Sequence, residues 1–526
     1  MSHGPRFYKN TLSTAQITQE ALQRILADLQ TAVQNGVQLI ELKHPAGEDD
    51  GRGIFSGDLG IALAYLRLAQ QSPSLTPPSR RSNEAADFHS LAHSRIPDDP
   101  SGHGLAIGLL SPLASKSPLA SATLRILYHL STGTARDVLD ADLVVLRDAV
   151  EMALGHGATG VYHGHELGAD EVLFGRAGLL WMLLNVRRWE EQGEGVFDEK
   201  QRAVLGGALG DDTVGRLVEV IVRAGREGGV ECRKILEKKG ESLTGDEEEM
   251  PLMWVWMKGH YGLGWAHGLT GILSILLSTP AEFITAHLSS IAATIKVLCN
   301  TCIAENGHLP TCIPPRSSPP HLMQICHGAP AFLSLMACAL RVPELVKVHW
   351  TPEWDIAINL ATQRVWVEGL LPKGGGLCHG IAGNAWPLLM LYVSFEENAG
   401  VLEEVRHKNP APTMSSATDG TLTADLFLSR ALAMLLHARE TQPYNSPPET
   451  ASNEYRMPDH PYSLFEGLAG TLCAWSETCV VLRRRLRKME LQQAGTDVKE
   501  DPVLAQCSKQ ELGFQFLGGN GVTGLL

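Results

Sequence analysis

The first part of this 526-residue chain lacks cysteine, since all ten cysteines lie at or after Cys232. A disulfide framework normally distributes its cysteines through a short secreted chain, so this distribution argues against one. We therefore expect a reducing, cytoplasmic environment, in which thiols remain available as metal ligands or nucleophiles.

The chain also lacks excess positive charge and long apolar runs. It carries 44 basic and 58 acidic residues, a net charge of −14, which argues against a general grip on nucleic-acid phosphates or anionic lipid. Its first residues, MSHGPRFYKN, contain no apolar segment of the secretory type. The apolar stretches run about 8 to 12 residues, short of the roughly 20 that a membrane-spanning helix needs. We expect neither a membrane span nor a nucleic-acid partner.

Alternating strand patterns are scarce, whereas glycine is abundant, at 52 residues. Many glycines belong to a repeated Gly-x-x-Gly turn followed by an apolar helical segment. The turn starts at Gly57, Gly175, Gly268, Gly380 and Gly467, with a variant at Gly328 and a degraded unit near 117–130. About seven such units predict an all-α fold, and if they close into an α/α toroid the turns gather at one end.

Between the units lie polar or proline-rich segments. We interpret residues 1–526 as a single domain with surface inserts near 72–104, 225–250, 409–421 and 441–461.

Three of the turns carry side chains that bind metals. Cys326-His327 opens one, Cys378-His379 opens another, and His267 lies in a third. A catalytic zinc site uses three protein ligands and one open position, which Cys326, Cys378 and His379 would supply. The alternative is that these are ordinary buried turn residues.

Two other patterns compete with this site. Cys299, Cys302, His308 and Cys312 have spacing that suggests a structural zinc site, but the first two lie in an apolar segment with helical periodicity, which favours core packing. Asp170, Glu171 and Glu466 precede turns and could form the paired carboxylates of a glycosidase, although acids at helix N-termini are more often caps.

The turns GWAHGLTGI, QICHGAPAF, KGGGLCHGIAGNAW and SLFEGLAGTLCAW resemble those of the lanthionine synthetase C-like family, and are closer to its eukaryotic branch than to the bacterial lantibiotic cyclases. The resemblance extends from about Arg6 to Leu482. It implies an α/α toroid with one zinc ion per chain, held by Cys326, Cys378 and His379.

The resemblance also implies an enzyme, a glutathione or thiol transferase that adds glutathione to dehydroalanine or dehydrobutyrine residues of peptides or proteins. It matches His267 to a general acid/base, His327 to a neighbouring active-site position, Asp170 to an acidic active-site residue, and Lys373 and Arg6 to glutathione contacts. An alternative is a non-catalytic scaffold that binds zinc and glutathione and docks on a signalling partner, which the acidic composition and the inserts would suit.

Besides the degraded second unit, the chain departs from the family pattern at two places. Ala331 stands where the turn usually has its second glycine, and we expect it to stiffen that turn. The ending GFQFLGGNGVTGLL replaces the family's usual C-terminus, and we expect an altered last helix or pocket wall.

Overall fold

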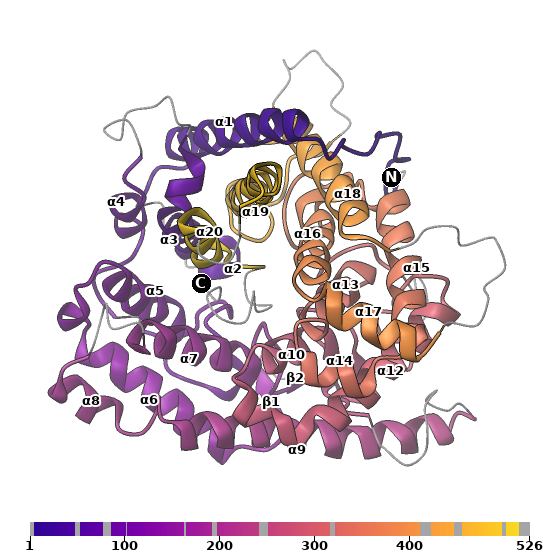
Figure 1. Cartoon of the computed structure of the whole chain (residues 1–526). Coiled ribbons are helices and arrows are strands. Elements are labelled where there is room, and N and C mark those ends of the chain that lie inside the picture. Colours follow the sequence, from indigo (N-terminus) through magenta and orange to yellow (C-terminus); the bar gives the residue numbers. More distant parts are fainter. Residues whose placement is uncertain are drawn as a thin grey trace.

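A computed structural model describes residues 5–47, 53–76, 86–100, 102–162, 165–191, 197–240, 251–315, 321–410, 422–445, 455–496 and 501–514. Within them, seven apolar helices form a closed ring (Figure 1). They are α3 (Asp58–Leu75), α5 (Pro118–Ser131), α7 (Arg176–Glu191), α10 (Leu269–Leu277), α13 (Ala329–Ala339), α16 (Ile381–Glu397) and α19 (Leu468–Ala494). Each packs against the next, and α19 packs against α3. The predicted all-α toroid of about seven units is confirmed, including the degraded unit, which is α5.

A second layer of helices covers the outside of the ring (Figure 1). Its long members are α1 (Gln19–Lys43), α6 (Asp140–Gly155), α9 (Asp211–Glu237), α12 (Leu288–Ala304), α15 (Pro352–Glu368) and α18 (Ala424–His437). Its shorter members are α4 (Phe88–His93), α8 (Glu199–Leu205), α11 (Ala281–Ile284), α14 (Pro343–His349) and α17 (Ala399–Lys408). Two further short helices, α2 (Gly53–Ser56) and α20 (Pro502–Gln510), pack against the inner helix α3. Inner helices such as α10 are buried on every side, because both neighbours and the outer layer cover them.

The second glycine of each turn fixes how an inner helix starts. A Cβ atom on Gly60, Gly178, Gly271, Gly383 or Gly470 would overlap the carbonyl oxygen six residues earlier, so only glycine allows this approach. The unit with Ala331 is built differently, because its first glycine, Gly328, has φ of 144°.

Main-chain hydrogen bonds then link one turn to the next around the ring. The amide of Phe465 donates to Phe55, Cys378 to Phe465, Cys326 to Cys378, Trp265 to Ile325, Leu173 to Ala266 and Leu110 to Phe174. All the helix-starting turns in this series therefore lie at one end of the toroid.

The sequence patterns missed a small antiparallel sheet, which runs in the order β1-β2-β3-β4-β5. Its strands are β1 (Thr159–Tyr162), β2 (His165–Gly168), β3 (Val255–Met257), β4 (His260–Gly262) and β5 (Cys312–Ile313). Strands of two to four residues are too short to show a detectable alternation.

Two sequence expectations need correction. The insert expected at 225–250 is helical up to Glu237, as part of α9, and its Gly225 and Gly228 allow close packing against Trp254 and Met253. The helical stretch Ala281–Ala304 is long and apolar enough to cross a membrane by length and composition alone, but 56% of its most apolar window is buried inside the protein. It packs against α14 and α15, which fits a core helix.

Most of the insert expected at 409–421 lies outside the described residues.

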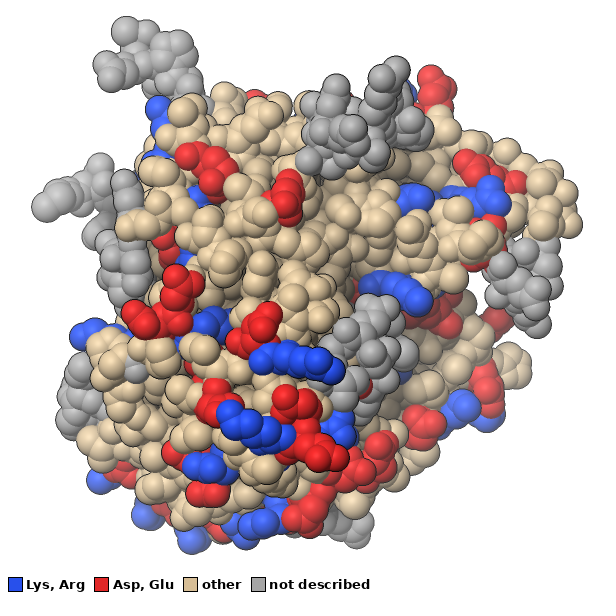
Figure 2. Space-filling view, turned by 90° about the vertical axis from the view of Figure 1, so that its left-hand side faces the viewer, with Lys and Arg blue, Asp and Glu red and all other residues tan. Residues whose placement is uncertain are grey.

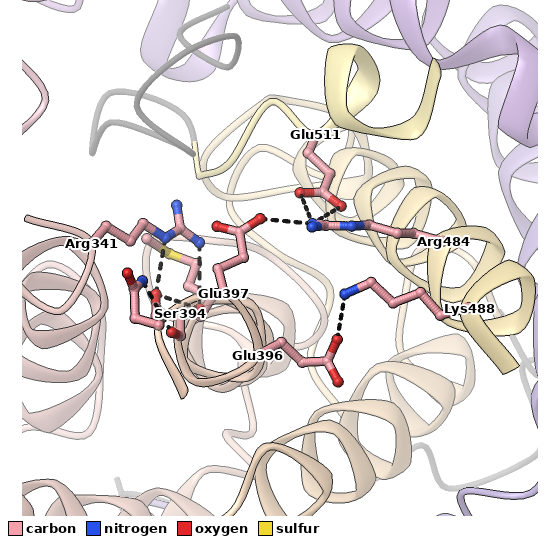
Figure 3. Close-up of polar contacts among 9 residues, drawn as sticks. Arg341, Ser394, Glu396, Glu397, Arg484, Lys488 and Glu511 are labelled. Atoms are coloured by element: carbon pink, nitrogen blue, oxygen red, sulfur yellow. Dashed lines mark hydrogen bonds and ion pairs between the residues drawn. The ribbon is translucent and has the colours of Figure 1, made fainter. Parts of the chain in front are cut away.

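The C-terminal segment closes against the inner ring. Arg484 on α19 binds Glu511 at 2.9 Å and Glu397 at 2.8 Å, and Lys488 binds Glu396 at 2.7 Å (Figure 3). Beyond Glu511, the ring of Phe514 packs against Trp386 and Trp265. The described part of the unusual ending is thus part of the core, whereas 515–526 lie outside the described residues.

On the face shown in Figure 2, acidic and basic side chains are interspersed.

Candidate functional site

The ring of turns brings the metal-binding side chains together. Cys326 and His327 directly precede α13, and Cys378 and His379 precede α16. The Cys326 amide lies 3.4 Å from the Cys378 carbonyl oxygen, so the two turns are directly joined.

The two cysteine sulfurs interact with each other inside the protein. Hydrogen bonds from Cys378 and His379, acting against burial, hold the pKa of the Cys326 thiol well below its usual range. The contact with Cys326 and burial raise the pKa of the Cys378 thiol well above its usual range. Cys326 is therefore the more acidic thiol of the pair.

These three side chains have the donor chemistry of a zinc site, namely two thiols and one imidazole, and the Cys326 thiol interacts with both Cys378 and His379. Among the described residues, however, no group of three or more His, Cys, Asp or Glu side chains has the arrangement of ligands around one ion. The donor types fit zinc, and the side chains would have to turn toward a common point to bind it.

His267 lies at the start of α10 and contacts a buried carboxylate from a neighbouring turn. Its Nδ1 is 2.8 Å from Oε2 of Glu171. Burial disfavours the charged imidazole, but Glu171 outweighs it and raises the pKa of His267. Glu171 thus holds His267 in one orientation and stabilises its protonated form.

The acidic partner of His267 is therefore Glu171 and not its neighbour Asp170. The Asp170 carboxylate is buried and binds Arg176 at 2.7 Å. Burial, opposed by Arg176, raises the pKa of Asp170 to about 6. Arg176 also donates hydrogen bonds to the main-chain oxygens of Ala153, His156 and Gly157. The ion pair between Asp170 and Arg176 therefore stabilises the start of α7.

His327 lies beside His267, with ring centroids 5.8 Å apart. The ring of Trp256 from β3 stacks on His267 and lies tilted against His327. Burial lowers the pKa of His327 and so favours its neutral form. Glu466, in the turn before α19, lies 3.8 Å from Nε2 of His379 and 3.5 Å from Nε2 of His460.

A cavity of about 370 Å³ opens beside His379, within the usual size range of small-molecule sites. Both predicted glutathione contacts, Arg6 and Lys373, line it, together with a third cation, Arg456. The pattern analysis missed Arg456 because it lies in a segment interpreted as an insert.

Main-chain pairing explains how these three cations meet. The amide of Tyr8 donates to the Leu370 carbonyl at 2.8 Å, which places the N-terminal segment beside the chain leading to Lys373. The amide of Arg456 donates to the Pro372 carbonyl at 2.8 Å. The segment from Leu370 to Lys373 thus gathers the positive side chains next to His379.

The competing cysteine pattern does not converge. Cys299 and Cys302 are buried in α12, as the helical interpretation predicted, and the Cys302 thiol faces the Ala357 carbonyl. The Cys312 thiol donates to the Pro314 carbonyl, and His308 contacts Glu368.

Comparison with known proteins gives three findings. A family model described as lanthionine synthetase C-like protein matches residues 146–411. The chain is 25% identical over 304 residues to "Glutathione S-transferase LANCL1" of Danio rerio and 27% identical over 310 residues to "LanC-like protein GCL1" of Arabidopsis thaliana. Each alignment covers 58% of this chain, and the chain spans about half of the relatives' lengths, 57% and 54%. It also resembles the solved structure "Nisin cyclase" with a TM-score of 0.31 at 12% identity, over 89% of this chain and 98% of that one.

Proposed function

Because the chain belongs to the lanthionine synthetase C-like family, we propose that it is a zinc-dependent enzyme that forms carbon–sulfur bonds. In this proposal it adds glutathione to dehydroalanine or dehydrobutyrine residues of peptides or proteins. The observation that carries it is the adjacency of two sites: a cavity with three cations shares His379 with the Cys326–Cys378 pair. The Danio rerio relative is named a glutathione S-transferase, which supports the choice of thiol.

The proposed zinc ligands are Cys326, Cys378 and His379. When bound, zinc would act as a Lewis acid and keep a thiol sulfur deprotonated at neutral pH. A free thiol, with a pKa of about 8.5, is mostly protonated at that pH. The cations Arg6, Lys373 and Arg456 would bind the carboxylates of glutathione and orient its sulfur.

The protein's own groups then handle the proton. Attack of the thiolate on the β-carbon of the dehydroamino acid forms the C–S bond and moves the alkene electrons onto the carbonyl, as an enolate. His267 would give its proton to the α-carbon, and Glu171 would stabilise the charged imidazole before transfer. His327 and Trp256 would form the neighbouring wall.

Zinc content and turnover test this assignment together. We expect about one zinc per chain in the unmutated protein, almost none in Cys378→Ala, and about one in His267→Ala. Turnover of a dehydroalanine peptide with glutathione should be lost in the first variant and reduced about 100-fold or more in the second.

The same experiment separates the enzyme from a non-catalytic scaffold. A scaffold would bind zinc and glutathione but leave the dehydroalanine peptide unmodified. Full activity in verified zinc-free protein would exclude the mechanism.

A further inference from the structure

Among the described residues that line the cation-lined cavity, one carries a carboxylate, namely Glu368 at the C-terminal end of α15. Its side chain is 14% exposed. Two imidazoles, those of His308 and His321, line the cavity with it. This acidic wall has no part in the thiol chemistry proposed above.

Neighbouring groups fix the position of Glu368 while leaving one oxygen available. Its Oε1 accepts from Arg364, one turn earlier on α15, at 3.2 Å and lies 3.4 Å from Nε2 of His308. Among the described residues Oε2 has no partner. The exposed oxygen of a held carboxylate is a suitable acceptor for a cationic ligand group.

One histidine contacts this carboxylate directly, and the second packs against the first. Their rings stack with centroids 4.9 Å apart, and Nε2 of His321 is 2.9 Å from Glu305. Burial lowers the pKa of His308, so at neutral pH it can donate to Glu368 without adding a positive charge. The turn before His308 is pinned to α15, because Arg364 donates to the Asn306 carbonyl at 2.8 Å.

The cavity is therefore bipolar. Arg6, Lys373 and Arg456 suit carboxylates, whereas Glu368 suits a cation. A simple anion site would have no use for a carboxylate in its wall, since like charges across a pocket repel. A γ-glutamyl thiol such as glutathione carries two carboxylates and one α-ammonium group, and so complements both walls.

We propose that Glu368 binds the α-ammonium group of the thiol co-substrate and thereby selects γ-glutamyl thiols whose amino group is free. The inference rests on the proposed function, because it takes glutathione as the ligand of this cavity. The ligand would lie with its carboxylates toward the cations and its amino group toward α15.

A ligand that lacks only the amino group tests this on the unmutated protein. Glutaryl-cysteinyl-glycine keeps both carboxylates and the thiol of glutathione. Calorimetric titration of the zinc-loaded protein should show glutathione binding about 10- to 100-fold more tightly than this analogue, as expected for a hydrogen bond between charged groups.

The variant Glu368→Gln removes the charge and keeps the shape. It should weaken glutathione binding about 10- to 100-fold, leave the analogue unchanged, and so abolish the discrimination. Glu353→Gln is the matched control, because Glu353 lies exposed in the first turn of the same helix and does not line the cavity.

The outcomes separate the two proposals. If the unmutated protein binds both ligands equally, or if Glu368→Gln still discriminates between them, Glu368 does not bind the ammonium group. The proposed function, glutathione addition, is unaffected by either result. If neither ligand binds the zinc-loaded protein, the proposed function fails and this inference fails with it.

Discussion

At the scale of single residues, two adjacent carboxylates have different tasks. Glu171 points to His267, whereas Asp170 points to Arg176. The sequence alone could not separate them, since both precede the same turn and differ only in which side of the chain they face. The proposed zinc ligands could be selected from the sequence, because Cys-His pairs recur at equivalent turns.

The variant Glu171→Gln should keep the fold and slow turnover about 10- to 100-fold. Glu171 raises the pKa of His267, so without it the proton donor loses its proton at lower pH. Activity that depends on protonated His267 falls as pH rises through that pKa, and the variant should shift this alkaline limb to lower pH. A pH profile of kcat measures the shift.

Asp170→Asn is the contrasting variant. It leaves the fully buried Arg176 without its counter-ion and should cost about 3 kcal/mol or more of the free energy of unfolding. It should not move the alkaline limb. If Asp170→Asn shifts that limb and Glu171→Gln does not, the roles assigned here are reversed.

At the scale of the element, the helix-starting turn carries the fold. Its glycine spacing is local in sequence, which is why the inner helices could be predicted. The cavity could not, because Arg6, His308, Glu368 and Arg456 come from four separated segments. Main-chain pairing brings the segments of Arg6 and Arg456 together, and the Arg364 side chain holds the segment of His308 to α15. Such long-range contacts leave no sequence pattern.

Gly383→Ala tests the need for close approach at the turn. A Cβ there would overlap the Leu377 carbonyl, so we expect a loss of about 1–3 kcal/mol in urea unfolding. Gly400→Ala in α17 is the control, because its added Cβ has no atom within 4 Å and alanine favours helix. Equal effects of the two substitutions would contradict the packing argument.

At the scale of the whole molecule, the ring closes where α19 meets α3, and the C-terminal segment packs against this junction. Buried Glu477 on α19 accepts hydrogen bonds from the amides of Leu512 and Gly513, and Arg67 on α3 donates to the Gly513 carbonyl. The sequence identified this ending as atypical but could not show that residues up to Phe514 fill the core. The hydrogen bond between Arg67 and Gly513 joins positions 446 residues apart, and no local sequence pattern indicates such a contact.

This closure should depend on pH through Glu511. Burial, opposed by Arg484, raises the pKa of Glu511 to about 7. In an unfolded chain the pKa of a glutamate side chain is about 4.3. Between these values the folded state binds more protons, so the free energy of unfolding should fall as pH rises from about 4.5 to about 7. The side chain in Glu511→Gln cannot ionise. Between pH 5 and pH 7 the free energy of unfolding of this variant, measured by urea unfolding, should therefore fall by on the order of 2 kcal/mol less than that of the unmutated protein. Glu490→Gln, at an exposed position on α19, is the control and should show the same pH dependence of the free energy of unfolding as the unmutated protein. If Glu511→Gln also shows that same pH dependence, the Glu511 carboxyl is ionised throughout this pH range.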